Sequence, residues 1–542
     1  MVRHVLGNGK IRIEVACVES RSQLYQRFLA FISPYFLSER VDGEIDLHLG
    51  LHEEASFLPE WKTRCTGLET IRRSTAEAFN LELSRGELSD GTQIAWNERD
   101  QTGYAFVPGS KRMDLYISDS SFIHLIEFFR YYCLLLEAGK GSVLLHASAV
   151  ENLETGEVLA IGGVKGAGKT TTMLNLVGSG KYGFFSGDKL LVDLHEGALR
   201  VRGWPDYPHV GVGSLRHHPE LCRKLGLLVS ELPMSEAEAG DKYLFAPELF
   251  YGALGKPRTP NGRLEGLLLP DILGKAQAPS LLYSLDKEHV DQRQLFEDPY
   301  GFTTANWHRL ANIEMTDSVR ELHREVYEGL YSVKWLKTSG HVSAEAIELQ
   351  LRMPNAIKIA LVAPSGSGKS TAASLIKQAF EQRGLSVLSE KLAQPLYDLQ
   401  AAYFETASID LPSGVQHQKL LENIATNLRM LSKDSLVQHL FSRLVGSNAE
   451  VIITDDLRDK ETDWPALVNS GYRVIRVACD EPTRIKRLQG RQDIQSQLKS
   501  PLDNSINSIE SHYVLENNST LDALEREVQS LVDTLLGHSH GN

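Results

Sequence analysis

The chain has 542 residues, 42% of them hydrophobic and 23% charged, and this length and composition predict a soluble globular protein with about three or four domains' worth of sequence. Its 57 Lys and Arg against 70 Asp and Glu give a net charge of −13, which argues against general binding to nucleic acid or to an anionic membrane. The five cysteines form no CxxC pair and the N-terminus has no apolar core like that of a signal peptide, so we expect a cytoplasmic protein.

Residues 1–135 are predicted to form an accessory α+β region. The segments KIRIEVACVE and EIDLHLGLH alternate as strands do, and SSFIHLIEFFRYYCLLLEAG has a helical pattern. No residues in this region have the spacing of a chemical site. We therefore infer that residues 1–135 form an accessory domain or one that contacts a partner.

A first phosphate-binding loop is predicted at Gly163–Thr170, in GVKGAGKT, between the strand EVLAIGGV and the helix GKTTTMLNLVGSG. Glycines allow backbone N–H groups to close on phosphates, and a helix N-terminus favours an anion. We expect Lys169 to neutralise phosphate oxygens of ATP and Thr170 to hold Mg²⁺. The predicted nucleotide-binding residues are Gly163, Gly166, Gly168, Lys169, Thr170 and Thr171.

Two polar residues at strand ends accompany this loop. Asp188 ends the next strand, where a carboxylate can reach the metal or accept a hydroxyl proton. His146 ends the strand SVLLHASAV before the loop, and it is either a site residue or a satisfied core histidine.

The segments LLHASAV, GGVKGAGKTTTMLNL and FFSGDKLLVD, followed by GWP, resemble the catalytic domain of HPr kinase/phosphorylase and its serine-kinase-like relatives. The resemblance implies a domain over 136–335 whose fold is related to phosphoenolpyruvate carboxykinase and which transfers phosphate to a hydroxyl. It places His146 in the active site and gives Asp188 a catalytic and metal-binding role. The family's Asp-Asp pair is Gly187-Asp188 here, so one carboxylate is missing. Relatives often assemble into oligomers, so a homo-oligomer is a possible state.

A second phosphate-binding loop is predicted in APSGSGKSTA, although Ala363 stands where the first glycine belongs. After a linker at 336–354, the strands IKIALVA, GLSVLSE, AEVIITDD and YRVIRVAC alternate with helical patterns and predict a doubly wound parallel sheet over 355–542. Mg²⁺ is expected at Ser370 and Asp455. The predicted nucleotide-binding residues are Gly366, Gly368, Lys369, Ser370 and Thr371.

The region from AEVIITDDLRD to RIKRLQGRQD, with the later HYVLENNSTLDAL, resembles the deoxynucleoside monophosphate kinases. By this resemblance Asp456 and Arg458 form the Asp-x-Arg motif at the acceptor and metal edge. A closing lid would present arginines to the phosphates; the alternative for RIKRLQGR is a solvated helical face. The arginines concerned are Arg484, Arg487 and Arg491.

The sequence therefore predicts an α/β chain with two different P-loop kinase domains in tandem, both using ATP and Mg²⁺. The leading hypothesis is a bifunctional kinase whose first half phosphorylates a hydroxyl and whose second half phosphorylates the resulting monophosphate. The acceptor would be a nucleoside, a nucleotide or a similar metabolite, with no nucleic acid or membrane as partner. One alternative joins a protein or peptide serine kinase to a nucleotide kinase. Another is an ATP-binding regulator with an impaired first half, motivated by Gly187.

Overall fold

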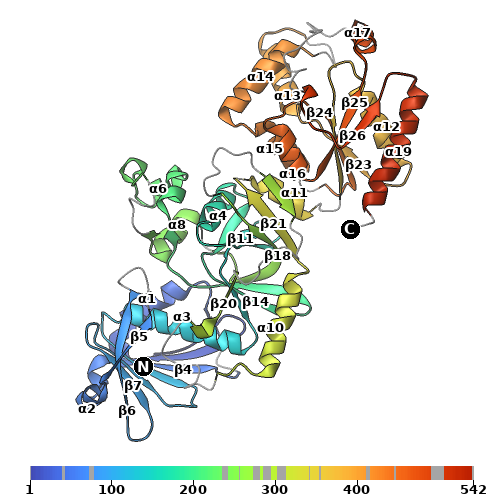
Figure 1. The fold of residues 1–542 in the computed structure, drawn as a ribbon. Helices are drawn as coiled ribbons and strands as arrows, with labels where there is room; N and C mark the ends of the chain where they lie inside the picture. The colour runs from blue at the N-terminus through green and yellow to red at the C-terminus, as the bar shows by residue number, and fades with distance from the viewer. Residues whose placement is uncertain are drawn as a thin grey trace. The chain divides into compact units, whose positions relative to one another are not determined.

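The computed structural model describes residues 2–39, 43–72, 79–234, 242–255, 257–272, 281–284, 295–301, 313–340, 342–352, 356–410, 416–444, 447–489 and 506–539. The chain forms two compact units (Figure 1). The first consists of Met1–Pro270 and Asp286–Trp335, and the second of Asp271–Leu285 and Leu336–Asn542. The predicted regions 1–135 and 136–335 thus lie in one unit, except for Asp271–Leu285, which belongs to the second.

A nine-stranded sheet begins the first unit, with the strand order β3-β1-β2-β4-β9-β8-β7-β6-β5. The predicted strands at KIRIEVACVE and EIDLHLGLH are confirmed, and their alternating burial matches a sheet with one covered face. The pairs β2–β4 and β4–β9 are parallel. The strands are β1 (Val2–Gly7), β2 (Arg12–Cys17), β3 (Leu37–Glu39), β4 (Leu47–Glu53), β5 (Gly67–Arg72), β6 (Leu81–Glu87), β7 (Gln93–Asn97), β8 (Thr102–Phe106) and β9 (Arg112–Ile117).

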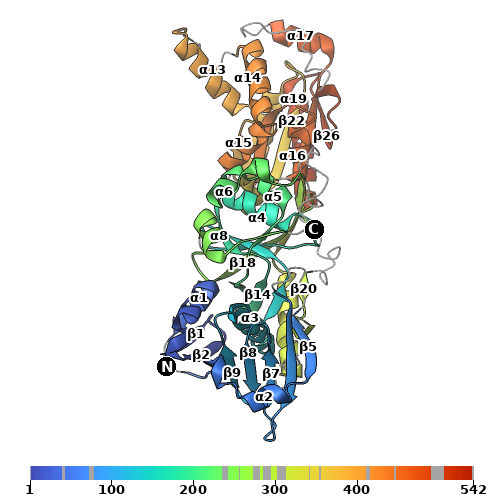
Figure 2. The same ribbon diagram turned by 90° about the vertical axis from the view of Figure 1, so that its left-hand side faces the viewer.

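The predicted helix in this region is α3 (Phe122–Gly139), which Figure 2 shows. Most of its side chains are buried. It shares one hydrophobic core with α1 (Ser22–Ile32), with strands of the nine-stranded sheet and with Leu144, Leu191 and Trp204 of the following region. Because α3 runs through the predicted boundary at 135, the accessory region and the first phosphate loop belong to one folded body. The short helix α2 (Pro59–Arg64) contacts β6 and β7.

A buried polar cluster, here called the Arg202 network, links α3 to the second sheet of this unit. The Arg202 guanidinium contacts Asp193, and its Nη2 lies 2.6 Å from Glu137 Oε2 on α3. Asn8 donates to Glu137 over 2.6 Å, and Lys10 reaches Asp193 over 3.2 Å. Buried charges are tolerated when each is paired, as they are in this cluster.

The second sheet carries the first phosphate loop, with the strand order β13-β11-β12-β18-β15-β14-β10-β20. Only the β12–β18 pair is parallel in this path. Helix α4 (Lys169–Gly178) packs on β11 and β13, and α10 (Asp317–Leu330) packs on β14 and β15. The strands are β10 (Val143–Leu145), β11 (Ser148–Asn152), β12 (Val158–Ile161), β13 (Tyr182–Ser186), β14 (Leu190–His195), β15 (Ala198–Gly203), β18 (Asn261–Leu269) and β20 (Phe296–Glu297).

Smaller elements follow β15 in the chain. They are β16 (His209–Val210) paired with β17 (Tyr243–Leu244), and the helices α5 (Val212–Arg216), α6 (Pro219–Lys224) and α8 (Pro247–Leu254).

The second unit contains the predicted parallel sheet, which is confirmed. All four pairings in the order β23-β24-β22-β25-β26 are parallel. Figure 1 shows helices on both faces of this sheet. Its strands are β22 (Ile357–Val362), β23 (Val387–Ser389), β24 (Val451–Leu457), β25 (Tyr472–Ala478) and β26 (Tyr513–Glu516). Its helices are α12 (Lys369–Glu381), α13 (Gln394–Thr406), α14 (Gln418–Leu431), α15 (Ser435–Leu444), α16 (Asp463–Asn469), α17 (Glu481–Gln489) and α19 (Leu521–Ser539).

The residues 336–354 that were predicted as a linker instead carry regular structure. Strand β21 (Lys334–Ser339) pairs with β19 (Leu281–Ser284), and helix α11 (Ala344–Arg352) packs against α15. The buried Ile347, Leu349 and Leu351 explain why this helix joins the core of the second unit.

Candidate functional sites

The first phosphate loop runs from β12 to α4, as the sequence predicts. Its backbone has positive φ at Gly163, Gly166 and Gly168, and Gly168 caps the helix in the left-handed conformation, which is costly for other residues. The Lys169 ammonium donates to the Gly163 carbonyl over 2.8 Å, so the lysine folds back over the loop. This is a concave set of backbone donors beside a cation, which suits a phosphate group.

The two hydroxyls after Lys169 differ in their surroundings. Thr170 is half-buried, and its hydroxyl has no hydrogen bond among the described residues. Thr171 exchanges a hydrogen bond of 2.6 Å with Ser214 of α5, which ties α4 to the helix beside it. Of the two, Thr170 has the hydroxyl that is available to a metal ion.

The structure brings His146 and Asp188 together, as the sequence predicts for a shared site. His146 Nε2 lies 3.2 Å from Asp188 Oδ1. The sequence did not indicate two further members: Lys189, and Glu297 on β20. Glu297 Oε1 lies 3.4 Å from His146 Nδ1, and its Oε2 lies 3.3 Å from Lys189 Nζ.

The charges in this cluster keep Asp188 ionised at neutral pH. Burial alone would raise the pKa of Asp188, but the hydrogen bond from His146 and the charges of Lys189 and Lys169 outweigh it and hold the pKa well below its ordinary value. Burial would lower the pKa of Lys189, and the carboxylates of Asp206, Glu297 and Asp188 reverse this and raise it. A carboxylate oxygen such as that of Asp188 and a hydroxyl oxygen such as that of Thr170 are both ligand types that suit Mg²⁺.

Gly187 stands where the family that this region resembles has an acid. Steric crowding does not require a glycine at this position. A Cβ built there would meet nothing within 4 Å, and its φ lies outside the left-handed region. A side chain at this position would therefore be accommodated.

The second phosphate loop runs from β22 to α12. Lys369 begins the helix and its ammonium donates to the Ala363 carbonyl, so Ala363 accepts the same bond that Gly163 accepts in the first loop. Gly368 has a φ of 88°, and a Cβ there would lie 2.2 Å from Asn517 Nδ2. Both conditions require glycine. Ser370 and Thr371 are exposed, and neither hydroxyl has a partner within the described ranges.

Two elements from the C-terminal part of the chain cover this loop. Asn517 donates to the Ser367 carbonyl over 2.8 Å, and Arg484 on α17 donates to the Ser365 carbonyl over 3.3 Å. Arg487 bonds Asn517 rather than the loop itself. Arg491 lies outside the described residues. The predicted lid arginines Arg484 and Arg487 are therefore at the loop, and Asn517 was not expected there.

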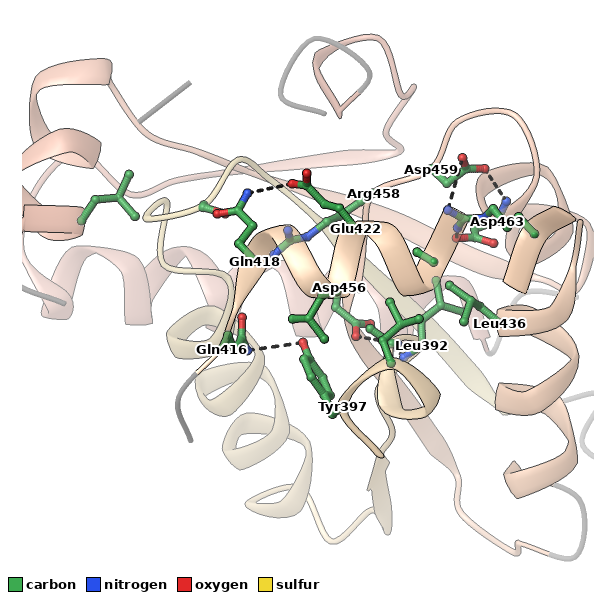
Figure 3. A pocket seen from close by; sticks show the side chains of 17 residues that line it. Leu392, Tyr397, Gln416, Gln418, Glu422, Leu436, Asp456, Arg458, Asp459 and Asp463 are labelled. Carbon is green, nitrogen blue, oxygen red and sulfur yellow. Dashed lines mark hydrogen bonds and ion pairs between the residues drawn. The ribbon is translucent and has the colours of Figure 1, made fainter. Parts of the chain in front are cut away.

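A cavity of about 140 Å³ adjoins this loop (Figure 3). It begins at Ser365 in the loop and at Leu488 of α17, and α13 and α14 form much of its wall. Apolar and polar groups share the lining, which is typical of a site for a small polar ligand. The polar side chains are Tyr397, Gln416, Gln418, Glu422, Arg429, Arg458, Asp456, Asp459 and Asp463.

The adjacent acids at the end of β24 have separate tasks. Asp456 accepts hydrogen bonds from the backbone N–H groups of Leu392 and Ala393, each over 2.9 Å, and thereby holds the turn that precedes α13. Burial and the charge of Asp455 raise the pKa of Asp456 despite these bonds. Asp455 and Arg458 have no hydrogen bond or ion pair among the described side chains. Thus Asp455 has no partner in the described part of the chain that would keep it from a metal ion, whereas Asp456 lines the cavity.

An ion pair closes the far side of the cavity. Arg429 Nη2 lies 2.5 Å from Asp463 Oδ2, and Asp463 Oδ1 is buried without a hydrogen bond. Burial raises the pKa of Asp463 to about 7, although the charge of Arg429 opposes the shift. No motif in the sequence indicates this pair, because α14 and α16 are brought together only by the fold.

No known protein family and no curated protein matches the chain. Three solved structures to which part of the chain is similar are an APS kinase from Mycobacterium tuberculosis in complex with AMPPNP and APS, a gluconokinase from Sinorhizobium meliloti 1021, and a shikimate kinase from Acinetobacter baumannii in complex with shikimate. Their identities are 14%, 17% and 12%, and their TM-scores are 0.23, 0.21 and 0.22. The matches cover 34%, 35% and 36% of this chain and 98%, 99% and 98% of the others. Similarity at this level assigns no substrate to the chain.

Two further observations concern the described part of the chain. None of its helices combines the length and apolar composition needed to cross a membrane. It also holds no cluster of three or more His, Cys, Asp or Glu side chains that would bind a metal ion by themselves. A Mg²⁺ ion bound with nucleotide needs fewer protein ligands than such a cluster supplies.

Proposed function

We propose that the second unit is an ATP-dependent kinase for a small molecule. The observation that supports this most directly is the cavity, which starts at Ser365 of the phosphate loop and ends among the side chains of α13 and α14. A phosphoryl donor held by the loop and an acceptor held in the cavity would meet at their common edge. Phosphoryl transfer needs such positioning more than covalent help from the protein.

The residues at this edge suit the charge that develops during transfer. Lys369 and the loop N–H groups would hold the phosphates of ATP, and Ser370 and Asp455 would hold Mg²⁺, which supplies positive charge to the phosphate oxygens. The acceptor oxygen forms the new bond to phosphorus as the bond to the ADP oxygen breaks. Arg458, which has no partner among the described residues, would face the acceptor.

We further propose that the acceptor is a nucleoside monophosphate or a similar metabolite. The cavity supports this choice because it combines leucine side chains for a planar apolar group with the amides of Gln416 and Gln418 and the Tyr397 hydroxyl. Gln416 already donates toward that hydroxyl over 3.4 Å, so both groups face one space (Figure 3).

We propose that the first unit is a second kinase, which transfers phosphate to a hydroxyl. Its support is the joint position of Lys169, Asp188 and His146 at one loop, with Asp188 or His146 receiving the hydroxyl proton. The leading form of the proposal is two successive transfers to one metabolite. The alternative is an ATP-binding regulator, which Gly187 supports because the site lacks one acid at that position. This alternative is tested alongside the kinase.

ATP binding would test both loops without any knowledge of the acceptor. Calorimetric titration with a non-hydrolysable ATP analogue and Mg²⁺ should show two sites in the wild-type chain and one site in each of Lys169→Ala and Lys369→Ala. Lys377→Ala is the matched control, because the Lys377 side chain on α12 is 42% exposed and its one ion pair with a described residue is to Glu381, at 3.8 Å. Two sites in Lys369→Ala would contradict the assignment of the second loop.

Phosphoryl transfer would then be measured with nucleosides, ribo- and deoxyribonucleoside monophosphates, and serine peptides, with products identified by mass. Loss of diphosphate in Lys369→Ala and loss of monophosphate in Lys169→Ala, from one compound, would support the two-step kinase. Phosphopeptide formation that depends on Lys169 would support the serine kinase. ATP binding by the first unit with no product that depends on Lys169 would support the regulator.

A further inference from the structure

We infer that Glu297 supplies the second carboxylate of the first phosphate-loop site, in place of the one that Gly187 lacks, and that it positions His146 for its work beside Asp188. This role rests on the proposed function of the first unit. Glu297 is a positioning residue in this account, because it acts through the imidazole.

The imidazole of His146 lies between two carboxylates. Its Nε2 is 3.2 Å from Asp188 Oδ1, and its Nδ1 is 3.4 Å from Glu297 Oε1. When one ring nitrogen has a fixed partner, the orientation of the ring and the tasks of both nitrogens are fixed as well. Glu297 therefore determines that Nε2, rather than Nδ1, faces Asp188.

Lys189 joins the same two carboxylates from the other side. Its Nζ lies 3.3 Å from Glu297 Oε2 and 3.9 Å from Asp188 Oδ2, and the residue is only 9% exposed. His146 and Lys189 are thus each shared by Asp188 and Glu297.

The backbone holds Glu297 in this place. Strand β20 pairs with β10 through Leu145 and Phe296, and the His146 N–H donates to the Leu295 carbonyl over 2.7 Å. In this antiparallel pair Glu297 lies opposite Leu144, and His146 follows Leu145 on the neighbouring strand, so Glu297 and His146 are diagonal neighbours across the pairing. Side chains fixed by regular strands are positioned more closely than those on free loops.

Position 187, by contrast, is open. A Cβ there would meet nothing within 4 Å, and its backbone conformation suits any residue. The absence of an acid at 187 is therefore compatible with a complete site, provided that a carboxylate reaches the cluster from another strand. Because position 187 is open, a carboxylate can be removed from position 297 and introduced at position 187 by mutation.

The test follows the imidazole of His146 in the full-length protein. Ring ¹⁵N resonances would be recorded with ¹⁵N-labelled histidine and assigned with His146→Gln. Glu297→Gln should shift both ring resonances of His146, whereas Glu325→Gln, an exposed change on α10, should leave them in place. Unchanged His146 resonances in Glu297→Gln, with the protein folded, would overturn the inference.

Phosphoryl transfer supplies the second readout. With an acceptor of the first unit, Glu297→Gln should lower kcat by about 10- to 100-fold and leave the KM for ATP within about threefold, and adding Gly187→Asp should restore part of kcat. An unchanged kcat in Glu297→Gln would also overturn the inference. If the wild type phosphorylates nothing, the proposed kinase function fails, and the resonances of His146 still decide the role of Glu297.

Discussion

Replacement of Arg202 by methionine should destabilise the first unit severely. The Arg202 side chain is 1% exposed, and it contacts Glu137, which is fully buried, and Asp193. Without the guanidinium, Asp193 keeps Lys10 at 3.2 Å and Arg200 at 3.3 Å, but Glu137 keeps only the neutral donors of Asn8 and Ser142. One buried carboxylate is then uncompensated, which typically costs about 3–5 kcal/mol.

Urea unfolding monitored by tryptophan fluorescence would measure this cost, because five of the six tryptophans fall within the residues of the first unit. With a slope of about 3 kcal/mol per molar urea, the midpoint of its transition should fall by about 1–2 M. Arg320→Met is the control: Arg320 pairs with Asp317 on the surface of α10, and its loss should change stability by less than about 1 kcal/mol.

A second variant separates charge from packing. Arg202→Met combined with Glu137→Gln removes both members of the buried pair and should recover a large part of the lost stability. The reasoning would be refuted if Arg202→Met shifted the midpoint no more than Arg320→Met does. It would also be refuted if the destabilisation in the double variant equalled the sum of the destabilisations of Arg202→Met and Glu137→Gln measured separately.

Three further predictions concern the second unit. Burial raises the pKa of Asp463 to about 7 from an ordinary value of 3.8, so the proton bound in the folded state stabilises the unit fully below about pH 4 and this contribution is lost as the pH rises through 7. Asp463→Asn should flatten the pH dependence of the urea midpoint between pH 5 and pH 8, and an unchanged slope would contradict the assignment. Gly368→Ala should weaken binding of the ATP analogue to the second loop by at least about tenfold, because its φ is 88° and its Cβ would lie 2.2 Å from the Asn517 amide. Gly384→Ala, which has similar φ but no atom within 4 Å, should lower stability without that loss of affinity. Asp456→Ala should cost about 1–2 kcal/mol, since two backbone N–H groups in the turn before α13 lose their acceptor; a smaller urea shift would show that water replaces it.

The local parts of both sites could be predicted from the sequence. Strand, glycine loop and helix are adjacent in the chain, so Lys169 and Lys369 were placed by their immediate neighbours. Asp188 and Asp455 were predicted because each follows an apolar strand run near a phosphate loop, and the structure places Asp188 beside His146. The five-stranded parallel sheet was predictable because its strands are apolar runs that alternate with helices.

The site residues that the sequence did not indicate make contacts with residues far away in the chain. Glu297 reaches His146 only because a two-residue strand pairs with β10, and a strand of that length has no periodic pattern. Asn517 and the Arg429–Asp463 pair depend in the same way on where distant elements pack. The role of Asp456 in holding the turn before α13 was hidden because two of its three partners are backbone groups, which every sequence possesses.

The contact between Asn517 and the second phosphate loop has a consequence for synthesis of the chain. Ser367 accepts its hydrogen bond from a side chain 150 residues further along, and the first site receives Glu297 after a similar separation from His146. On the ribosome, each loop must therefore wait for a late residue before its surroundings are complete. Ligand-binding capacity would then mature in order along the chain, at the first loop once residue 297 has emerged and at the second only after residue 517.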